Sequence, residues 1–258
     1  MRRFIVSILG AAALTAAVTV ATPPAAASGG AHLEKQSWSF DGMFGTFDQA
    51  ALKRGWQVYK EICSNCHSMN LVAYRNLSAL GFTEEEIKAI AHEKEKEDGP
   101  NEQGERFTRF AKPSDRIVPP YANEQAARAA QNGALPPDFS LITKARKGGA
   151  DYVYNLMLGY KDTPPADVTL MPGMNYNPVF PGGQIAMAPQ LFDGMVKYAD
   201  GTASTPEQMA KDIATFLTWA AEPELNERHG MGVKTLLFLV VLTAMFYALK
   251  RQIWAPVH

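Results

Sequence analysis

Two cysteines and a histidine lie together in the segment EICSNCHSMN, which covers residues 61–70. Cys63 and Cys66 are three positions apart, and His67 directly follows the second cysteine. The chain of 258 residues holds no other cysteine. Two thiols and an imidazole at this spacing are able to form a disulfide, to bind a metal ion, or to attach a porphyrin covalently.

Covalent attachment of haem gives a role to all three residues, whereas the other interpretations account for only some of them. A disulfide between Cys63 and Cys66 would close a very small loop and add little stability to a chain of this length. A redox dithiol would leave His67 without a role, and a structural zinc site needs four protein ligands. The pattern C-x-x-C-H therefore predicts one haem c, covalently bound through Cys63 and Cys66, with His67 as a ligand of its iron.

The second axial position on the iron decides which chemistry is available. A methionine there closes the iron to substrates and favours electron transfer, whereas an open position allows peroxidase or ligand-binding chemistry. Residues 164–189 contain six prolines and are expected to form a long irregular loop, which in a compact domain is usually functional. Of the three methionines in this loop, Met171, Met174 and Met187, we rank Met187 first because short apolar residues and Pro189 surround it.

An amphipathic helix is expected to lead into the C-x-x-C-H motif. Apolar residues recur at helical spacing before it, at Leu52, Trp56, Tyr59 and Ile62. One face of this helix can therefore pack on a core while its end presents the thiols.

A second helix is predicted near the end of the same domain. Thr205 can cap it, Pro206 fits its first turn, and Gln208 can complete a capping box, while Pro223 ends it. Its predicted apolar face consists of Met209, Ile213, Phe216, Leu217 and Ala220. Two such helices packed around a haem predict a mostly α fold: a class I cytochrome c-like haem domain with inserted loops and one C-terminal transmembrane helix.

The first 27 residues predict a secretory signal peptide. Two arginines at positions 2 and 3 precede an apolar run, and three alanines end it. We therefore expect residues 1–27 to be cleaved. Residues 28–228 should then form a haem domain on the periplasmic side of a bacterial inner membrane.

Residues 229–250 are predicted to form a single transmembrane anchor. The uncharged run from Thr235 to Leu249 is shorter than the roughly 20 residues that a bilayer span needs. Snorkelling of Lys234 extends the span back to about Gly230. With an exported N-terminus, the tail of residues 251–258 lies in the cytoplasm.

The distribution of charge bears on the partners. A formal net charge of −1 gives no electrostatic basis for binding nucleic acid. Residues 83–105 carry nine acidic and three basic residues, and Thr83 and Glu86 predict a capping box on a short helix there. Opposite charge speeds the encounter of proteins that must bind and release quickly, so we expect an acidic docking surface for a basic soluble cytochrome c.

Several segments together closely resemble the cytochrome c1 family, the haem subunits of the cytochrome bc1 complex. The resemblance runs from about Trp56 to Trp254. The segments that carry it are EICSNCHSMNLVAYRNL, DGPNEQGE, EQAARAAQNGALPPDFS, KARKGGADYVYNLMLGY, NPVFPGGQIAMAPQL and MAKDIATFLTWAAEPE, followed by the C-terminal anchor.

The resemblance implies a role for individual residues. It implies haem thioethers at Cys63 and Cys66, and axial ligands at His67 and Met187. It also implies that Arg146 pairs with a haem propionate. It places Tyr152 and the NGALPPD turn, residues 132–138, close to the haem edge.

The resemblance also implies a function. It implies the electron-transfer subunit of quinol–cytochrome c reductase, which takes one electron from the Rieske iron-sulfur protein and passes it to a soluble cytochrome c. Cytochrome b would be a further partner, in a complex expected to be dimeric. The alternatives are a membrane-anchored cytochrome c carrier that works outside a bc1 complex and, from a different class, a haem enzyme with an open iron site.

Overall fold

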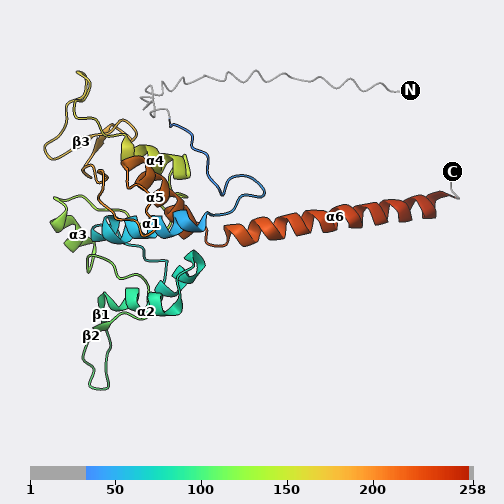
Figure 1. The fold of residues 1–258 in the computed structure, drawn as a ribbon, viewed down its shortest axis with the longest axis horizontal. Coiled ribbons are helices and arrows are strands. Elements are labelled where there is room, and N and C mark those ends of the chain that lie inside the picture. Colours follow the sequence, from blue (N-terminus) through green and yellow to red (C-terminus); the bar gives the residue numbers. More distant parts are fainter. Residues whose placement is uncertain (1–32, 256–258) are drawn as a thin grey trace, which may run out of the picture.

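The computed structural model describes residues 33–255, which form a helical domain with one long helix projecting from it (Figure 1). The mostly α fold predicted from the sequence, including the long apolar C-terminal helix, is confirmed. The elements in chain order are α1 (Gln49–Glu61), η1 (Cys63–Asn65), η2 (Tyr74–Leu80), α2 (Glu84–His92), β1 (Glu95–Asp98), β2 (Phe107–Phe110), α3 (Glu124–Ala130), α4 (Gly149–Leu158), β3 (Asn175–Tyr176), β4 (Gln184–Ile185), α5 (Pro206–Ala221) and α6 (Leu225–Trp254). The two η elements are short 3-10 helices.

Helix α1 has the amphipathic form that the sequence predicts. The side chain of Asp48 caps its N-terminus by accepting a hydrogen bond from the amide of Ala50 at 2.9 Å. Leu52, Trp56 and Tyr59 are all buried on its inner face. The helix ends at Glu61, two residues before Cys63, so packing of its inner face fixes the start of the motif.

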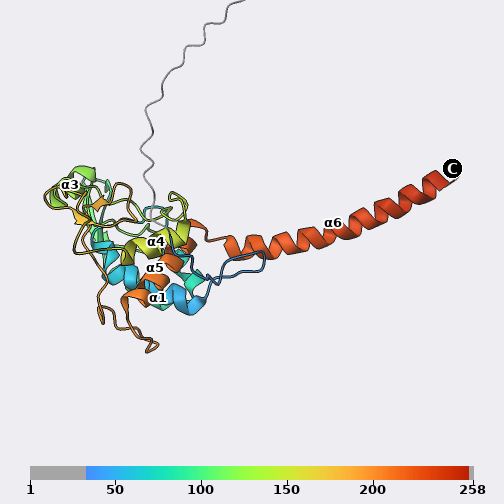
Figure 2. The same ribbon diagram turned by 90° about the horizontal axis from the view of Figure 1, so that it is seen from above.

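Helices α1, α4 and α5 form the centre of the domain, with α5 packed against both of the others (Figures 1 and 2). Gly55 lies where α1 meets α5, and a Cβ atom there would be 2.2 Å from the carbonyl oxygen of Asp212. The absence of a side chain therefore allows the two backbones to approach closely. Beside the crossing, the rings of Trp56, Tyr59 and Phe216 lie with centroids 5.7 to 5.8 Å apart.

Helix α5 begins and ends where expected, with one difference at its cap. Thr205 accepts a hydrogen bond from the amide of Gln208 at 3.2 Å. The side chain of Gln208 does not close the predicted capping box, because it donates instead to Asp212 at 3.0 Å. The five residues of the predicted apolar face, Met209, Ile213, Phe216, Leu217 and Ala220, are all buried.

The acidic segment forms helix α2 and strand β1, which pairs with β2 as an antiparallel hairpin. The predicted capping box is present: Thr83 accepts from the amide of Glu86, and Glu86 accepts from the amide of Thr83 at 2.7 Å. In the hairpin Glu95 pairs with Phe110 and Asp98 with Phe107. The proline-rich loop of residues 164–189 also contains order, because β3 and β4 pair in it as a second small hairpin.

Helix α6 spans 30 residues and is the one helix in residues 33–255 that is long and apolar enough to cross a membrane. None of its most apolar stretch is buried inside the protein. The helix is longer at both ends than the predicted anchor of residues 229–250. Its first residue, Leu225, is buried in the domain core, so α6 is a direct continuation of the folded domain. The predicted signal peptide, residues 1–27, lies outside the described residues.

Candidate functional site

The C-x-x-C-H motif folds into one tight turn at the end of α1. The amides of Cys66 and His67 both donate to the carbonyl oxygen of Cys63, at 3.1 and 2.9 Å. The two intervening residues turn back toward α1: the Ser64 hydroxyl donates to the carbonyl oxygen of Lys60, at 2.8 Å. The turn thus gathers two thiols and an imidazole at one helix end. Both thiols are half-buried and neither is in a disulfide.

The ring of His67 is held in one tautomer. Its Nδ1 atom lies 2.9 Å from the carbonyl oxygen of Pro137, which can only accept a hydrogen bond. Nδ1 must therefore carry the proton, and Nε2 of the neutral ring is left with a free lone pair. The ring also stacks on Phe139, with centroids 3.9 Å apart and planes 15° from parallel.

Burial keeps the His67 imidazole neutral. Removal from water lowers the pKa of His67, and the contact with Pro137 and the charge of Asp138 oppose this only in part. A neutral imidazole whose Nδ1–H is bonded to a backbone carbonyl presents Nε2 in the form that ligates a metal. The donor set of this turn therefore fits haem iron.

The turn at residues 132–138 is the partner of the motif. Pro137 of this turn accepts the hydrogen bond from His67. The next residue, Asp138, accepts hydrogen bonds from the hydroxyl of Ser68 and the backbone amide of Asn70, both at 2.8 Å. Burial by itself would raise the pKa of Asp138, but these bonds and those from Ser140 outweigh it, so the pKa lies below its usual range. The carboxylate stays ionised and joins the two loops.

Cys63 lacks the lowered pKa that a reactive redox thiol needs. Burial raises the pKa of Cys63 to about 12, so this thiol stays protonated at neutral pH and is a poor nucleophile. The sulfur of Cys66 accepts a weak hydrogen bond from Gln131 at 3.4 Å, and Gln131 also donates to the hydroxyl of Tyr121 at 2.7 Å. In residues 33–255 no three His, Cys, Asp or Glu side chains gather as a metal-binding group.

Met187 lies two residues beyond β4, and its backbone is fixed by two side chains. The hydroxyl of Tyr160 donates to the Met187 carbonyl oxygen at 3.0 Å, and the side-chain NH₂ group of Asn175 donates to the same oxygen at 3.4 Å. The side chain of Met187 is half-buried, whereas Met171 in the same loop is 56% exposed.

Arg146 and Tyr152 are neighbours at the start of α4. Tyr152 is buried, which raises the pKa of its hydroxyl, and the Arg146 guanidinium counteracts part of this rise. Burial also raises the pKa of Tyr160, and the Tyr152 hydroxyl adds to this rise. Tyr152 thus lies near both Arg146 and the tyrosine that holds Met187.

The residues expected to hold the haem therefore form two groups. One contains Cys63, Cys66 and His67, with the 132–138 turn; the other contains Met187, with Tyr160, Tyr152 and Arg146. The sequence reasoning missed Phe139, Gln131, Tyr121 and Tyr160. Phe139 could have been found from its position next to the NGALPPD turn, whereas Tyr160 is far from Met187 in the sequence and had no local signal.

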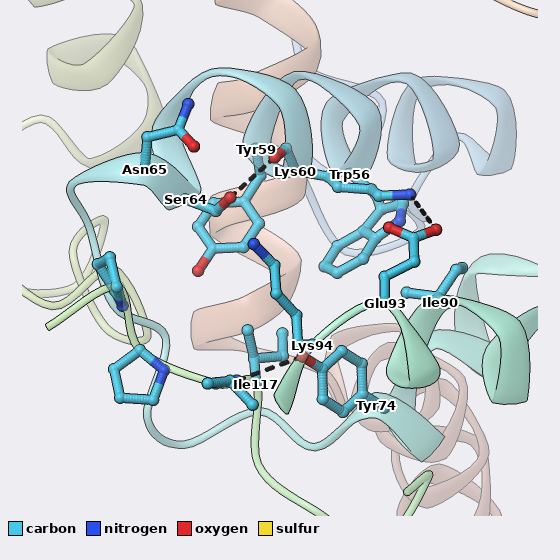
Figure 3. A pocket seen from close by; sticks show the side chains of 13 residues that line it. Trp56, Tyr59, Lys60, Ser64, Asn65, Tyr74, Ile90, Glu93, Lys94 and Ile117 are labelled. Atoms are coloured by element: carbon cyan, nitrogen blue, oxygen red, sulfur yellow. Dashed lines mark hydrogen bonds and ion pairs between the residues drawn. The ribbon is translucent and has the colours of Figure 1, made fainter. Parts of the chain in front are cut away.

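A cavity of about 320 Å³ lies behind the motif (Figure 3). Ser64 and Asn65, the residues between the two cysteines, line it, but Cys63, Cys66 and His67 do not. Across the cavity Lys60 forms an ion pair with Glu93 at 2.7 Å. This cavity is therefore separate from the surface that the thiols and imidazole present.

Comparison with known proteins agrees with these observations. Residues 38–257 match the Cytochrome C1 family. The chain is 53% identical over 232 residues to a mitochondrial "Cytochrome c1, heme protein" of Saccharomyces cerevisiae, covering 90% of this chain and 75% of that one. It is 50% identical over 244 residues to the cytochrome c1 of Rhodospirillum rubrum, covering 89% and 90%. It is 48% identical over 263 residues to a mitochondrial "Cytochrome b-c1 complex catalytic subunit" of Candida albicans, covering 100% and 91%. Because the match extends over most of the chain and includes the turn that holds His67, this protein belongs to the cytochrome c1 family.

Proposed function

We propose that this protein is the electron-transfer subunit of a quinol–cytochrome c oxidoreductase of the bc1 type. It receives one electron from a Rieske iron-sulfur protein and delivers it to a soluble cytochrome c. The observation that carries the proposal is the fixed tautomer of His67, whose Nδ1 atom donates to the Pro137 carbonyl oxygen at 2.9 Å. Together with two free thiols in the same turn, it matches the requirements of a c-type haem. The haem name carried by the yeast relative supports the same conclusion.

Each candidate residue has a role in holding this cofactor. Cys63 and Cys66 would bind it covalently, and His67 and Met187 would ligate its iron. When bound there, haem supplies a one-electron redox centre. Tyr160 and Asn175 fix the Met187 backbone, which resists displacement of the methionine and keeps the site closed to small ligands.

The second group of residues sets the charge around the site. Arg146 is half-buried, and a guanidinium can form two parallel hydrogen bonds with a carboxylate such as a haem propionate. Tyr152 is buried beside it, in the first turn of α4.

The proposed partners follow from the two ends of the molecule. Helix α6 anchors the chain in a bacterial inner membrane beside cytochrome b, with the haem domain in the periplasm, within a dimeric complex. Exposed glutamates occupy positions 84–86 in α2, position 93 at its C-terminal cap and position 95 at the start of β1. This acidic face is suited to brief contact with a basic soluble cytochrome c.

The test is a visible spectrum and a redox titration of the purified membrane protein, as wild type and as Met187→Leu. We expect the methionine charge-transfer band to disappear in the variant and the midpoint potential to fall strongly. Met171→Leu, at an exposed position in the same loop, is the matched control and should retain both. A variant at position 187 that keeps the band and the potential would exclude Met187 as the ligand.

Membership of the complex is tested separately. Extraction in mild detergent should recover the chain together with a two-haem b-type cytochrome and an iron-sulfur protein. Recovery of the chain alone, with its c-type spectrum intact, would favour a free membrane-anchored carrier instead.

A further inference from the structure

Two exposed apolar side chains lie at the tip of a loop that precedes α1. Phe44 is 77% exposed, the highest value for a large apolar side chain in the described part of the chain, and Met43 is 57% exposed. Large apolar groups displayed together at a loop tip are unfavourable in water and indicate a surface that something apolar covers.

Buried contacts at its base hold the loop of residues 38–47 rigidly on the domain. The position of its tip is therefore set by the fold. Trp38 and Phe40 stack with centroids 5.5 Å apart, and Phe40 packs on Phe47 at 5.1 Å. All three rings are buried, and the indole N–H of Trp38 donates to Asp151 of α4 at 2.8 Å. The loop therefore divides its apolar residues: three rings hold its base in the core, and the two at the tip face outward.

The tip turns tightly on itself. Gly42 has a φ of +78°, and the amide of Gly45 donates back to the Gly42 carbonyl oxygen at 3.3 Å. A Cβ atom on Gly45 would lie 2.3 Å from the carbonyl oxygen of Asp41, so only glycine fits there. The backbone of this turn therefore determines that Met43 and Phe44 point outward.

Two hydrogen bonds fix this loop to the first turns of α6. The amide of Phe47 donates to the Asn226 side-chain oxygen at 3.0 Å, and Nδ1 of His229 donates to the Gly45 carbonyl oxygen at 2.7 Å. Figures 1 and 2 both show the segment before α1, in blue, beside the start of α6. The tip is thus level with about residue 229 of the membrane helix.

That level coincides with the membrane boundary. A hydrocarbon core about 30 Å thick needs about 20 helical residues at 1.5 Å each. Counted back from Leu249, the last residue of the uncharged run, such a span begins near Gly230. The residue bonded to the loop, His229, directly precedes it.

We propose that Met43 and Phe44 insert into the outer lipid interface beside α6, as a second membrane contact of the haem domain. One helix alone lets a domain swivel about its axis, whereas a rigid second contact fixes which face of the domain points toward the membrane. The occupant is lipid because hydrogen bonds hold the loop beside the first turns of α6, and the apolar stretch that follows them is entirely unburied.

The test measures the membrane depth of a nitroxide at position 44. The full chain with Phe44→Cys is extracted in mild detergent with the subunits that accompany it, labelled, and transferred to phosphatidylcholine nanodiscs. Collision with oxygen, which concentrates in lipid, is compared with collision with a nickel chelate, which stays in water. Wild type carried through the same labelling sets the background from Cys63 and Cys66, and Met43→Cys provides a second position.

Two matched controls bracket the result. Leu239→Cys, in the middle of α6, should report lipid, and Phe107→Cys, an exposed apolar residue of β2 far from α6, should report water (Figure 1). We expect the ratio of oxygen to nickel collisions at position 44 to be severalfold higher than at position 107. A water-like ratio at 44 with a lipid-like ratio at 239 would overturn the proposal while leaving the anchor intact. Protection from both reagents would also overturn it, because a protein surface would then cover the tip.

Discussion

Arg54 of α1 and Asp212 of α5 form a two-point ion pair beside the crossing of their helices. Nε and Nη2 of the guanidinium lie 2.9 and 3.0 Å from the two carboxylate oxygens. The side chain of Asp212 is 1% exposed and that of Arg54 is 15% exposed. The pair therefore joins two helices that lie 158 residues apart in the sequence.

Replacing Asp212 with alanine should destabilise the haem domain by about 2 kcal/mol or more, because it leaves a partly buried guanidinium with only Asp200 as a partner. Thermal or urea unfolding in detergent measures the effect. Glu84→Ala, which removes the exposed pair with Lys88 on α2, is the control and should give no measurable change. Equal effects of both substitutions would show that the Arg54–Asp212 pair contributes no more to stability than an exposed ion pair.

Gly55→Ala should destabilise the same contact by about 1–3 kcal/mol, the usual range for overpacking a closely packed core. The added methyl group would lie 2.2 Å from the Asp212 carbonyl oxygen and 2.6 Å from Cβ of Phe216, so the helices must move apart. Gly230→Ala, a helical glycine of α6 with no atom near its would-be Cβ, is the matched control. If Gly55→Ala unfolded at the same temperature as wild type, the close approach of the α1 and α5 backbones would be contradicted.

Asp115 should make stability depend on acid pH. Arg109 binds both its oxygens, at 2.7 and 3.0 Å, and holds the pKa of Asp115 well below its usual range, with burial opposing and Lys112 and Lys96 adding to the effect. The unfolded carboxyl titrates at roughly pH 3.9, so this contribution is complete above that pH and declines as the pH falls toward the lower folded value.

Asp115→Asn should accordingly lower the free energy of unfolding by about 1–2 kcal/mol at pH 7. The difference in this free energy between wild type and the variant should decrease as the pH falls from about 4 to about 2. Urea unfolding at a series of pH values measures it. Asp193→Asn, at an exposed position, is the control. If the difference in free energy of unfolding between wild type and Asp115→Asn stayed constant down to about pH 2, this ion pair would not be the source of the acid dependence.

Cys66→Ser should leave haem attached through Cys63 alone. The pyridine haemochrome of the denatured protein should then have its α band at a longer wavelength than wild type, since one porphyrin vinyl group stays unreacted. Ser64→Ala, between the two cysteines, should leave the band unchanged. An unshifted band in Cys66→Ser would mean that Cys66 forms no thioether.

Tyr160→Phe should loosen the Met187 segment without removing the methionine. The hydroxyl that donates to the Met187 carbonyl oxygen is lost while the ring is kept. We expect cyanide to bind the oxidised protein severalfold faster than in wild type, because the methionine is displaced more easily. Tyr154→Phe, in α4 and packed edge-on against Trp38, is the control. Unchanged cyanide binding would show that Tyr160 does not hold the ligand segment.

The sequence by itself determined the local features. The C-x-x-C-H spacing predicted the chemistry, and the helical recurrence of Leu52, Trp56 and Tyr59 predicted the helix that leads into it. Thr83, Glu86 and Thr205 identified helix starts correctly, and the apolar run near the C-terminus identified α6. Such features depend on residues within a few turns of one another, so their signals are present in a short stretch of sequence.

Only the tertiary structure decided how these elements meet. It showed that Pro137, 70 residues from His67, sets the imidazole tautomer, and that Gln208 bonds Asp212 and does not complete its capping box. It also brought Gly45 to His229, 184 positions away, and so revealed the loop beside the membrane helix. Contacts of this kind arise from the packing of distant segments around a common core, and no local pattern of spacing specifies them.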